Sequence, residues 1–274
     1  MASLATSRTT VPTMSGQVHL DVADAVATIT LDHQERRNAI SRDMWVGLLD
    51  AATTIADDES IRVAVIRGAG DVAFASGADI SQFGETRADG DANTAYDATT
   101  EAATAALSRL AIPTIAAVHG FCIGGGLAVA LTADLRITAD DGRFGIPAAR
   151  LGVGYAHPGI RGLIALVGPS HAKRILFTGD RFEAVDALNM GLVNEVVPKA
   201  QLDERVADVA RTIAGNAPLT IRAAKMAVTT LLRDPDAQDF APVEAAVHAC
   251  FESEDYREGV TAFMEKRRPE FRGR

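Results

Sequence analysis

Three consecutive glycines, at positions 124–126, follow an apolar, β-branched run at 113–118 and open a further apolar stretch with helical character. A strand that enters a glycine-rich turn at the start of a helix presents free backbone N–H groups at the positive end of that helix. Because glycine has no Cβ atom, a ligand can approach this backbone closely. Such a turn can hold a developing oxyanion, since its donors are fixed before the reaction begins. A lone run of three glycines also suits tight helix–strand packing.

A second strand-to-turn stretch, at residues 74–80, lies upstream of the glycines. It can aim a second backbone N–H group at the same point. Two converging donors favour stabilisation of a negative oxygen over packing alone. The pair of stretches therefore favours a site that holds a developing oxyanion.

Together these stretches resemble the enoyl-CoA hydratase/isomerase family, the crotonase superfamily. Further similar segments follow in the same order, at 143–147, 151–152, 176–180, 191–193 and 258–267. The resemblance covers roughly residues 18–272. It implies an α/β fold: a crotonase-type spiral of ββα units with a C-terminal helical trimerisation region. A shared fold specifies the reaction far less than the architecture.

The resemblance also implies how a substrate would be held. The N–H groups of Ala78 and Gly125 would bind the carbonyl oxygen of an acyl-CoA thioester. A neighbouring subunit would bring Phe263 and Lys266 to the nucleotide end of coenzyme A. The remaining contacts to coenzyme A would come from Arg36, Arg37, the backbone at Asn38, Ser76, Asp79 and Ile80. Arginines suit phosphate groups, although Arg36 and Arg37 can also be explained as a solvated loop. No metal site is expected, and no cofactor except coenzyme A as part of the substrate.

Two glutamates that hydratases of this family use as acid and base are absent. The matching positions are Ala128 and Ala148, and no glutamate occurs between Glu101 and Glu183. Paired carboxylates with separated pKa values suit the activation of water and delivery of a proton. Standard two-glutamate hydration is therefore not expected. The acids of this interval, which read as element ends or turns, are Asp134, Asp140, Asp141 and Asp180.

Other members of the family use a residue shortly after the second glutamate position, which here falls on Tyr155 and His157. Either side chain can serve as acid or base, since histidine titrates near neutral pH. The alternative interpretation places Tyr155 in the pocket wall and makes His157 the cap of a helix that begins at Gly159. Arg150 either pairs with an acidic acyl group or with Asp140 or Asp141.

The elements that must position these residues follow from hydrophobic period and turn residues. Strands are expected at 18–22, 26–31, 61–66, 113–118, 135–138 and 192–196. Helices are expected at 41–57, 94–110, 125–133, 159–167, 170–177, 184–190, 201–214, 219–232, 242–251 and 255–266. Residues 81–93 are expected to form a mobile loop, and residues 144–157 a buried loop that lines a pocket. The predicted divisions are a flexible tail (1–15), a spiral core with the acyl-CoA site (16–198) and a helical region (199–274).

Charge, apolar runs and cysteine content limit the kinds of partner and location to be expected. The 274 residues carry 27 Lys and Arg against 36 Asp and Glu, a net charge of −9, which gives no electrostatic reason to expect nucleic-acid binding. No apolar run approaches the ~20 residues that span a bilayer. Two cysteines, Cys122 and Cys250, fit a reducing cytoplasm. The predicted function is acyl-CoA processing by a homotrimer or dimer of trimers, with an atypical or unknown reaction; the alternative is a non-catalytic acyl-CoA-binding protein.

Overall fold

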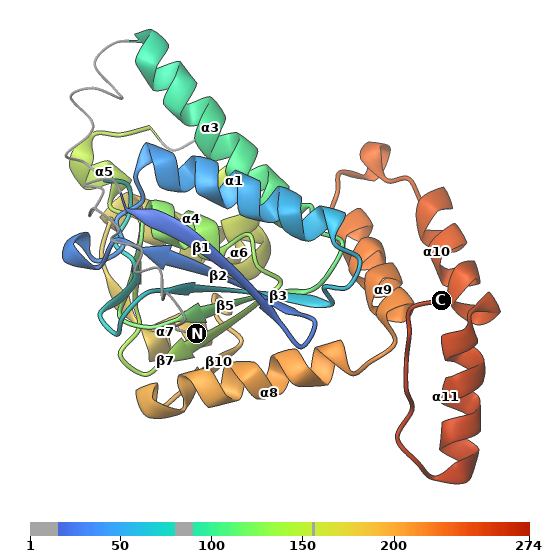
Figure 1. The fold of residues 1–274 in the computed structure, drawn as a ribbon. Coiled ribbons are helices and arrows are strands. Elements are labelled where there is room, and N and C mark those ends of the chain that lie inside the picture. The colour runs from blue at the N-terminus through green and yellow to red at the C-terminus, as the bar shows by residue number, and fades with distance from the viewer. Residues whose placement is uncertain (1–15, 80–89, 155–156) are drawn as a thin grey trace, which may run out of the picture.

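The computed structural model describes residues 16–79, 90–154 and 157–274. The predicted tail at 1–15, Ile80, residues 81–89 of the predicted loop, and Tyr155 lie outside the described residues. Two β-sheets with helices packed on them form the body of the molecule, and a helical arm extends from it (Figure 1). The predicted α/β class is confirmed.

The larger sheet contains six strands in the order β1-β2-β3-β5-β7-β10. Strands β1 and β2 form an antiparallel hairpin, and its turn residues Asp24 and Ala25 have φ values of 50° and 64°. The left-handed region is what a two-residue hairpin turn requires. All other neighbours in this sheet are parallel. The strands are β1 (Gln17–Ala23), β2 (Val26–Asp32), β3 (Val63–Gly68), β5 (Thr114–Val118), β7 (Leu135–Ala139) and β10 (Glu195–Val197).

Most helices agree with the hydrophobic periods, with shifts at their ends. The expected helices at 159–167 and 170–177 are instead joined in one helix, α6, across a kink at Gly168, and α5 was not expected. Ser41 caps α1 by accepting a hydrogen bond from the Met44 N–H at 3.2 Å. Helix α3 begins at Gly90, so the expected loop extends too far. The α-helices are α1 (Arg42–Asp57), α3 (Gly90–Ser108), α4 (Gly125–Ala130), α5 (Ala148–Leu151), α6 (His157–Thr178), α7 (Ala184–Asn189), α8 (Leu202–Ala214), α9 (Pro218–Leu231), α10 (Ala241–Glu252) and α11 (Glu254–Glu265). Short 3₁₀ turns lie at η1 (Gln34–Arg36), η3 (Lys199–Gln201) and η4 (Pro235–Ala237).

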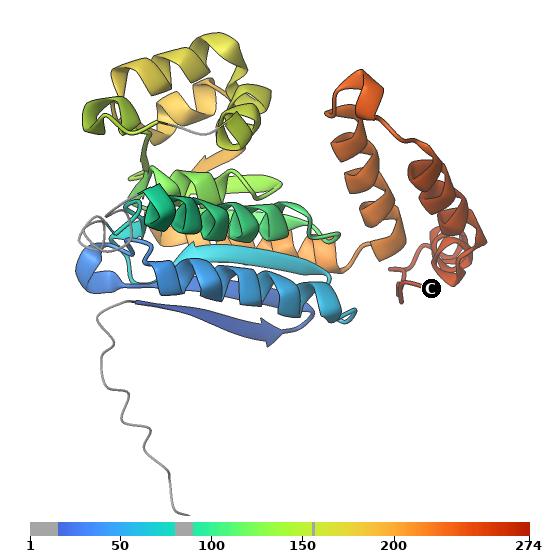
Figure 2. The ribbon, with the colours of Figure 1, turned by 90° about the horizontal axis from the view of Figure 1, so that it is seen from above.

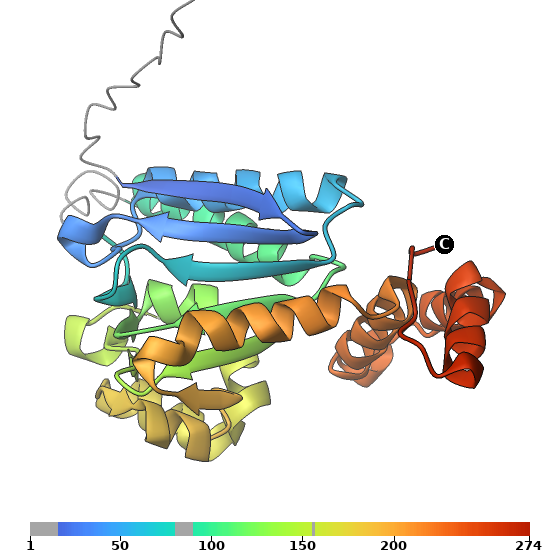
Figure 3. The same cartoon turned by 60° about the horizontal axis from the view of Figure 1, so that its bottom comes forward.

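Alternate residues of the parallel strands bury opposite faces of the larger sheet. Ile66 and Val118 belong to the main core with α1 and α3, whereas Val65 and Ala117 pack with α8 in a second cluster. Figure 3 shows α8 lying across the strands. Helix α8 thus packs on the sheet although it lies in the region 199–274.

The smaller sheet has the order β4-β6-β8-β9. The expected strand at 113–118 is confirmed as β5, but a further strand, β6, lies between it and the glycines. Strand β5 ends at Val118 in the larger sheet, and β6 begins at Phe121 in the smaller one. Between them Gly120 has φ 51°, and an added Cβ would lie 2.7 Å from the Val72 carbonyl carbon. The chain therefore crosses between sheets at a position that only glycine fits. The strands are β4 (Ala73–Ala75), β6 (Phe121–Ile123), β8 (Arg143–Gly145) and β9 (Phe182–Glu183).

Helices α9, α10 and α11 form the arm, which projects to one side of the body (Figures 1 and 2). Two basic side chains fasten it. Arg62 donates to the carbonyls of Ala214 at 2.9 Å and Phe271 at 2.7 Å. Lys225 of α9 donates to the Ile112 carbonyl and to Asp134, both at 2.7 Å.

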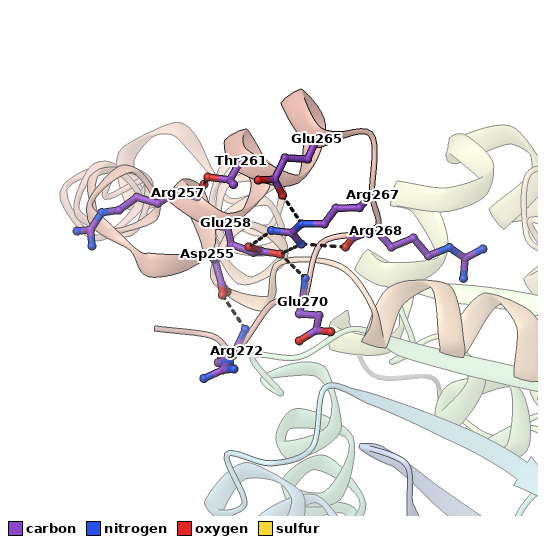
Figure 4. A network of polar contacts seen from close by, with 9 residues as sticks. All are labelled: Asp255, Arg257, Glu258, Thr261, Glu265, Arg267, Arg268, Glu270 and Arg272. Atoms are coloured by element: carbon purple, nitrogen blue, oxygen red, sulfur yellow. Dashed lines mark hydrogen bonds and ion pairs between the residues drawn. The ribbon is translucent and has the colours of Figure 1, made fainter.

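The C-terminal residues fold back onto α11 and are held there by carboxylates (Figure 4). Buried Asp255 accepts hydrogen bonds from the N–H groups of Arg272 and Gly273 at 2.6 and 2.8 Å. Glu258 accepts from Arg267 through both oxygens, at 2.6 and 2.8 Å. The C-terminal segment after α11 is therefore part of the folded arm.

Candidate active site

The two predicted oxyanion turns lie side by side because the strands that precede them, β4 and β6, pair in parallel. A Cβ added to Gly125 would lie 3.4 Å from the Ala78 backbone nitrogen. Gly77 and Gly124 have φ values of 116° and 52°, a region that side chains disfavour. Within the described part of the chain, no hydrogen bond is donated by the N–H of Ala78 or Gly125. The two donors are thus adjacent and available to a ligand.

A third segment, residues 36–40, supports the first turn. The Ile40 N–H donates to the Gly77 carbonyl at 2.7 Å, and the Asp79 N–H donates back to Ile40 at 3.0 Å. The Ser76 N–H donates to the Arg37 carbonyl at 3.0 Å. This ladder fixes the direction of the Ala78 N–H before any ligand binds.

Buried Asn38 and Trp45 contribute to the site in ways that sequence reasoning missed. The Asn38 amide donates to the carbonyls of Ala69 and Ala73 at 2.9 and 2.7 Å, so it ties the segment to the start of β4. The Trp45 ring lies 3.4 Å from the Cβ position of Gly125, and its Nε1–H donates to the Tyr96 hydroxyl at 3.1 Å. The helical period assigned Trp45 only to the core, and no local signal distinguishes a core residue that also backs a turn.

The two alanines occupy positions next to the oxyanion turns. Ala128 lies one helical turn after Gly125 on α4, and Ala148 is the first residue of α5. Both are half-buried. A methyl group can neither activate water nor deliver a proton, so these positions supply no acid or base.

The four acids of the interval are held by structural partners. Asp134 accepts from Thr114 and Lys225, and Asp141 accepts from the Gly120 N–H at 3.0 Å and pairs with Lys199 at 2.8 Å. Asp140 accepts from the Lys199 N–H at 3.1 Å. Asp180 pairs with Arg150. Of the two alternatives for that arginine, pairing with Asp140 or Asp141 is therefore wrong, and pairing with an acidic acyl group stays a prediction. Each of the four acids thus has a hydrogen-bond or ion-pair partner within the protein.

The predicted acid–base candidates lie at or next to a gap in the described residues, at 155–156. Tyr155 lies outside the described residues, and so does the side chain of His157. Helix α6 starts at His157 itself, so the expected helix start at Gly159 is wrong. The expected buried loop is also corrected: residues 149–154 are exposed.

Two buried ionisable side chains lie at the end of β5 and in β6. Burial, with Arg67 nearby, lowers the pKa of His119, whose Nε2 has no hydrogen-bond partner in the described residues. Burial raises the pKa of the Cys122 thiol, which keeps it neutral.

The residues expected to hold coenzyme A lie in two places. Arg36 pairs with buried Asp79 at 3.4 Å, and the Ser76 hydroxyl donates to the Arg36 carbonyl at 3.1 Å. Phe263, 82% exposed, and Lys266 belong to the arm instead. In Figure 1 the arm helix α11 and the site helix α5 lie at opposite ends of the molecule. Phe263 and Lys266 are therefore remote from the oxyanion turns of their own chain.

No group of three or more His, Cys, Asp or Glu side chains suited to a metal ion occurs among the residues described. Over the same residues, no helix is long and apolar enough to cross a membrane.

Comparison with known proteins decides the family. The sequence profile of the enoyl-CoA hydratase/isomerase family matches residues 21–274. The chain belongs to the enoyl-CoA hydratase/isomerase family. This confirms the crotonase superfamily and the crotonase-type fold that the motifs predicted. Family membership also makes acyl-CoA processing the general activity.

Relatives and solved structures cover nearly the whole chain. A crotonyl-CoA hydratase of Syntrophomonas wolfei is 34% identical over 92% of this chain and 96% of its own. A carnitinyl-CoA dehydratase of Escherichia coli O157:H7 is 33% identical over 95% of this chain and 100% of its own. The structure of an enoyl-CoA hydratase/carnithine racemase from Magnetospirillum magneticum is 38% identical, with a TM-score of 0.87 over 94% of this chain and 96% of that one.

Proposed function

We propose that this family member binds an acyl-CoA thioester with its carbonyl oxygen between the N–H groups of Ala78 and Gly125. The observation that carries the proposal is the adjacency of these two donors, neither of which has a partner in the described part of the chain. An oxyanion-hole donor typically contributes about 3 kcal/mol to transition-state stabilisation. Two relatives, a crotonyl-CoA hydratase and a carnitinyl-CoA dehydratase, support an acyl-CoA substrate.

The proposed reaction is not two-glutamate hydration. Ala128 and Ala148 carry no carboxylate, and the four nearby acids are engaged elsewhere. The oxyanion site can still stabilise an enolate formed when a proton leaves the carbon next to the thioester. That step needs one acid–base group, for which we propose His157 or Tyr155. Isomerisation, hydration or dehydration through such a single group all fit this arrangement.

A second candidate is a non-catalytic acyl-CoA-binding protein. The same two alanines favour it, because the site would then keep thioester binding without proton transfer. A turnover assay separates the candidates, since only the first predicts product.

The proposed assembly is a homotrimer or a dimer of trimers. Apolar side chains on the arm support it, because exposed apolar patches mark interaction surfaces. Phe251, Phe263 and Met264 are 63%, 82% and 76% exposed. Their remoteness from the glycine turn also fits the expectation that Phe263 and Lys266 serve the site of a neighbouring subunit. The two unpaired cysteines support a cytoplasmic location as part of the proposal.

Calorimetry tests the binding proposal. Butyryl-CoA should bind and butyrate should not, because the site is built for a thioester oxygen and a nucleotide. Equal affinity for the two ligands would overturn the proposal.

Turnover of a crotonyl-CoA and longer enoyl-CoA panel then tests the chemistry. His157→Ala or Tyr155→Phe should lower kcat strongly with little change in the affinity for butyryl-CoA. If neither substitution changes a measurable rate, both catalytic assignments are wrong. If the unmodified protein turns over no substrate but binds butyryl-CoA, the second candidate stands.

A further inference from the structure

The only tryptophan of the chain, Trp45, is buried beside one of the two oxyanion donors. It belongs to α1 and is 1% exposed. Its ring carbon Cζ2 lies 3.4 Å from the position that a Cβ atom of Gly125 would take, and the Ala78 nitrogen lies 3.4 Å from the same position. The edge of the indole and the Ala78 N–H group therefore border the same small space beside Gly125.

The backbone also connects Trp45 to the second donor. The Trp45 N–H donates to the Ser41 carbonyl at 3.1 Å, in the first turn of α1. Ser41 directly follows Ile40, which forms a parallel β-bridge with Ala78. A displacement of Trp45 would therefore affect both donors, Gly125 by contact and Ala78 through the start of α1.

Tyr96 of α3 fixes the orientation of the indole. Helices α1 and α3 lie side by side (Figure 1). The Trp45 Nε1–H donates to the Tyr96 hydroxyl at 3.1 Å, and Tyr96 is 6% exposed. A buried indole N–H needs an acceptor, because leaving it unpaired costs the free energy of its desolvation. The position of the Tyr96 hydroxyl therefore sets the direction in which the ring edge points.

Packing between α1 and α3 does not by itself require this hydrogen bond. Apolar side chains at both positions would fill the core, and replacing both partners of a buried hydrogen bond by apolar groups of the same shape is often nearly neutral. The hydrogen bond adds a fixed orientation of a flat ring whose edge lies next to Gly125. An oxyanion site needs such fixed surroundings, because its donors must be in place before charge develops.

We propose that Tyr96 is a positioning residue for the oxyanion site, and that it acts through Trp45. Its hydroxyl holds the indole beside Gly125, and the indole in turn fixes where the Gly125 N–H group lies relative to that of Ala78. The proposal rests on the proposed function and deepens it, since it extends the machinery of the site to α3. Misplacement of reacting groups by about 1 Å can cost about 10²-fold in rate, so a remote hydroxyl can matter at this site.

Tyr96→Phe tests the role, because it removes the acceptor and keeps the ring. The variant should bind butyryl-CoA about tenfold more weakly, the equivalent of about one hydrogen bond. It should also lose most of the shift of the thioester carbonyl band in the infrared spectrum of the complex, while its affinity for coenzyme A, which has no thioester, stays unchanged. Thr104→Val is the matched control: it removes a hydroxyl of α3 that donates to carbonyls of its own helix, and it should change none of these quantities.

A double-mutant cycle determines whether Tyr96 acts through Trp45. In a Trp45→Phe background no indole N–H needs an acceptor, so adding Tyr96→Phe should change neither butyryl-CoA affinity nor the carbonyl band further. Additive effects of the two substitutions would overturn the proposal. A Tyr96→Phe variant with the native carbonyl shift, or one that binds butyryl-CoA and coenzyme A equally more weakly, would also overturn it.

The unmodified protein provides a measurement that needs no variant to fold. Labelling with ¹⁵N-tryptophan gives a single Nε1–H resonance, because Trp45 is the only tryptophan. Butyryl-CoA should move this resonance and coenzyme A should not, since only the thioester places an oxygen beside Gly125. If butyryl-CoA binds with a shifted carbonyl band but leaves the indole resonance in place, the positioning role is wrong and the proposed function stands. If the unmodified protein binds no thioester, the proposed function itself fails and the positioning role with it.

Discussion

Gly125 and Ala78 come from turns on neighbouring strands, and a methyl group on Gly125 would touch the Ala78 nitrogen at 3.4 Å. The next glycine is in a different situation. A Cβ on Gly126 would collide with Ala75, whose own Cβ would be 2.8 Å away. The first glycine thus leaves room for a ligand, and the second allows the helix to pack on its strand.

This contrast predicts opposite effects for two similar substitutions. Gly125→Ala should leave the melting temperature unchanged or raise it, because alanine favours helix by up to about 1 kcal/mol, yet it should greatly weaken thioester binding. Gly126→Ala should lower stability by about 1–3 kcal/mol through overpacking. Thermal unfolding and butyryl-CoA calorimetry check both variants. Equal losses of stability would show that the turn glycines serve packing alone.

Restoring the two carboxylates should restore hydration. Acid–base groups each contribute about 10²–10⁴-fold, so Ala128→Glu with Ala148→Glu should raise crotonyl-CoA hydration well above the native rate. Ala149→Glu, an exposed neighbour on α5, is the control and should have no effect. Brisk hydration by the native protein would contradict this account.

Assembly should depend on the arm. Light scattering should give three or six times the chain mass of 28.8 kDa. Leu231→Asp, at a position that is 61% exposed, should shift the protein toward monomer, whereas Thr53→Asp on exposed α1 surface should not. A native monomer at micromolar concentration would refute the trimer.

The contacts that hold the C-terminal segment on α11 should depend on pH through Glu258. Hydrogen bonds from Arg267, together with the Glu270 N–H, lower the pKa of Glu258 to about 2 from an ordinary value of 4.5. The stabilisation of the folded C-terminal segment by the Glu258 carboxylate is therefore fully present above pH 4.5 and disappears as the pH falls toward 2. Hydrogen exchange at the Glu270 amide, which donates to Glu258 at 2.8 Å, should lose protection over that range. In the Glu258→Gln variant the Glu270 amide should lose this protection already at neutral pH. In the Glu252→Gln variant, whose side chain lies outside this network, it should keep it.

The long elements were predictable from sequence because the hydrophobic pattern repeats several times along each of them. Helix α1 agrees with the sequence pattern, as do the hairpin and the four α-helices that follow Pro198. The smaller sheet was not predicted in full, because strands of two or three residues are too short to show alternation. Strand β6, after Gly120, was therefore missed, although the end of the preceding strand at 118 was predicted.

The candidate site was predictable only where local sequence carries the signal. Glycines mark the turns directly, so Ala78 and Gly125 were found together. Trp45 was missed because its contribution comes from tertiary contact with Gly125, which no spacing along the chain encodes.

The central claim is that the N–H groups of Ala78 and Gly125 polarise a thioester carbonyl. Infrared difference spectroscopy of bound butyryl-CoA, labelled with ¹³C at the carbonyl, measures that polarisation without requiring turnover. The carbonyl band should move to lower frequency on binding, because two hydrogen bonds weaken the C=O bond, and Gly125→Ala should abolish the shift. A band at its solution frequency in the complex with the native protein would contradict the claim.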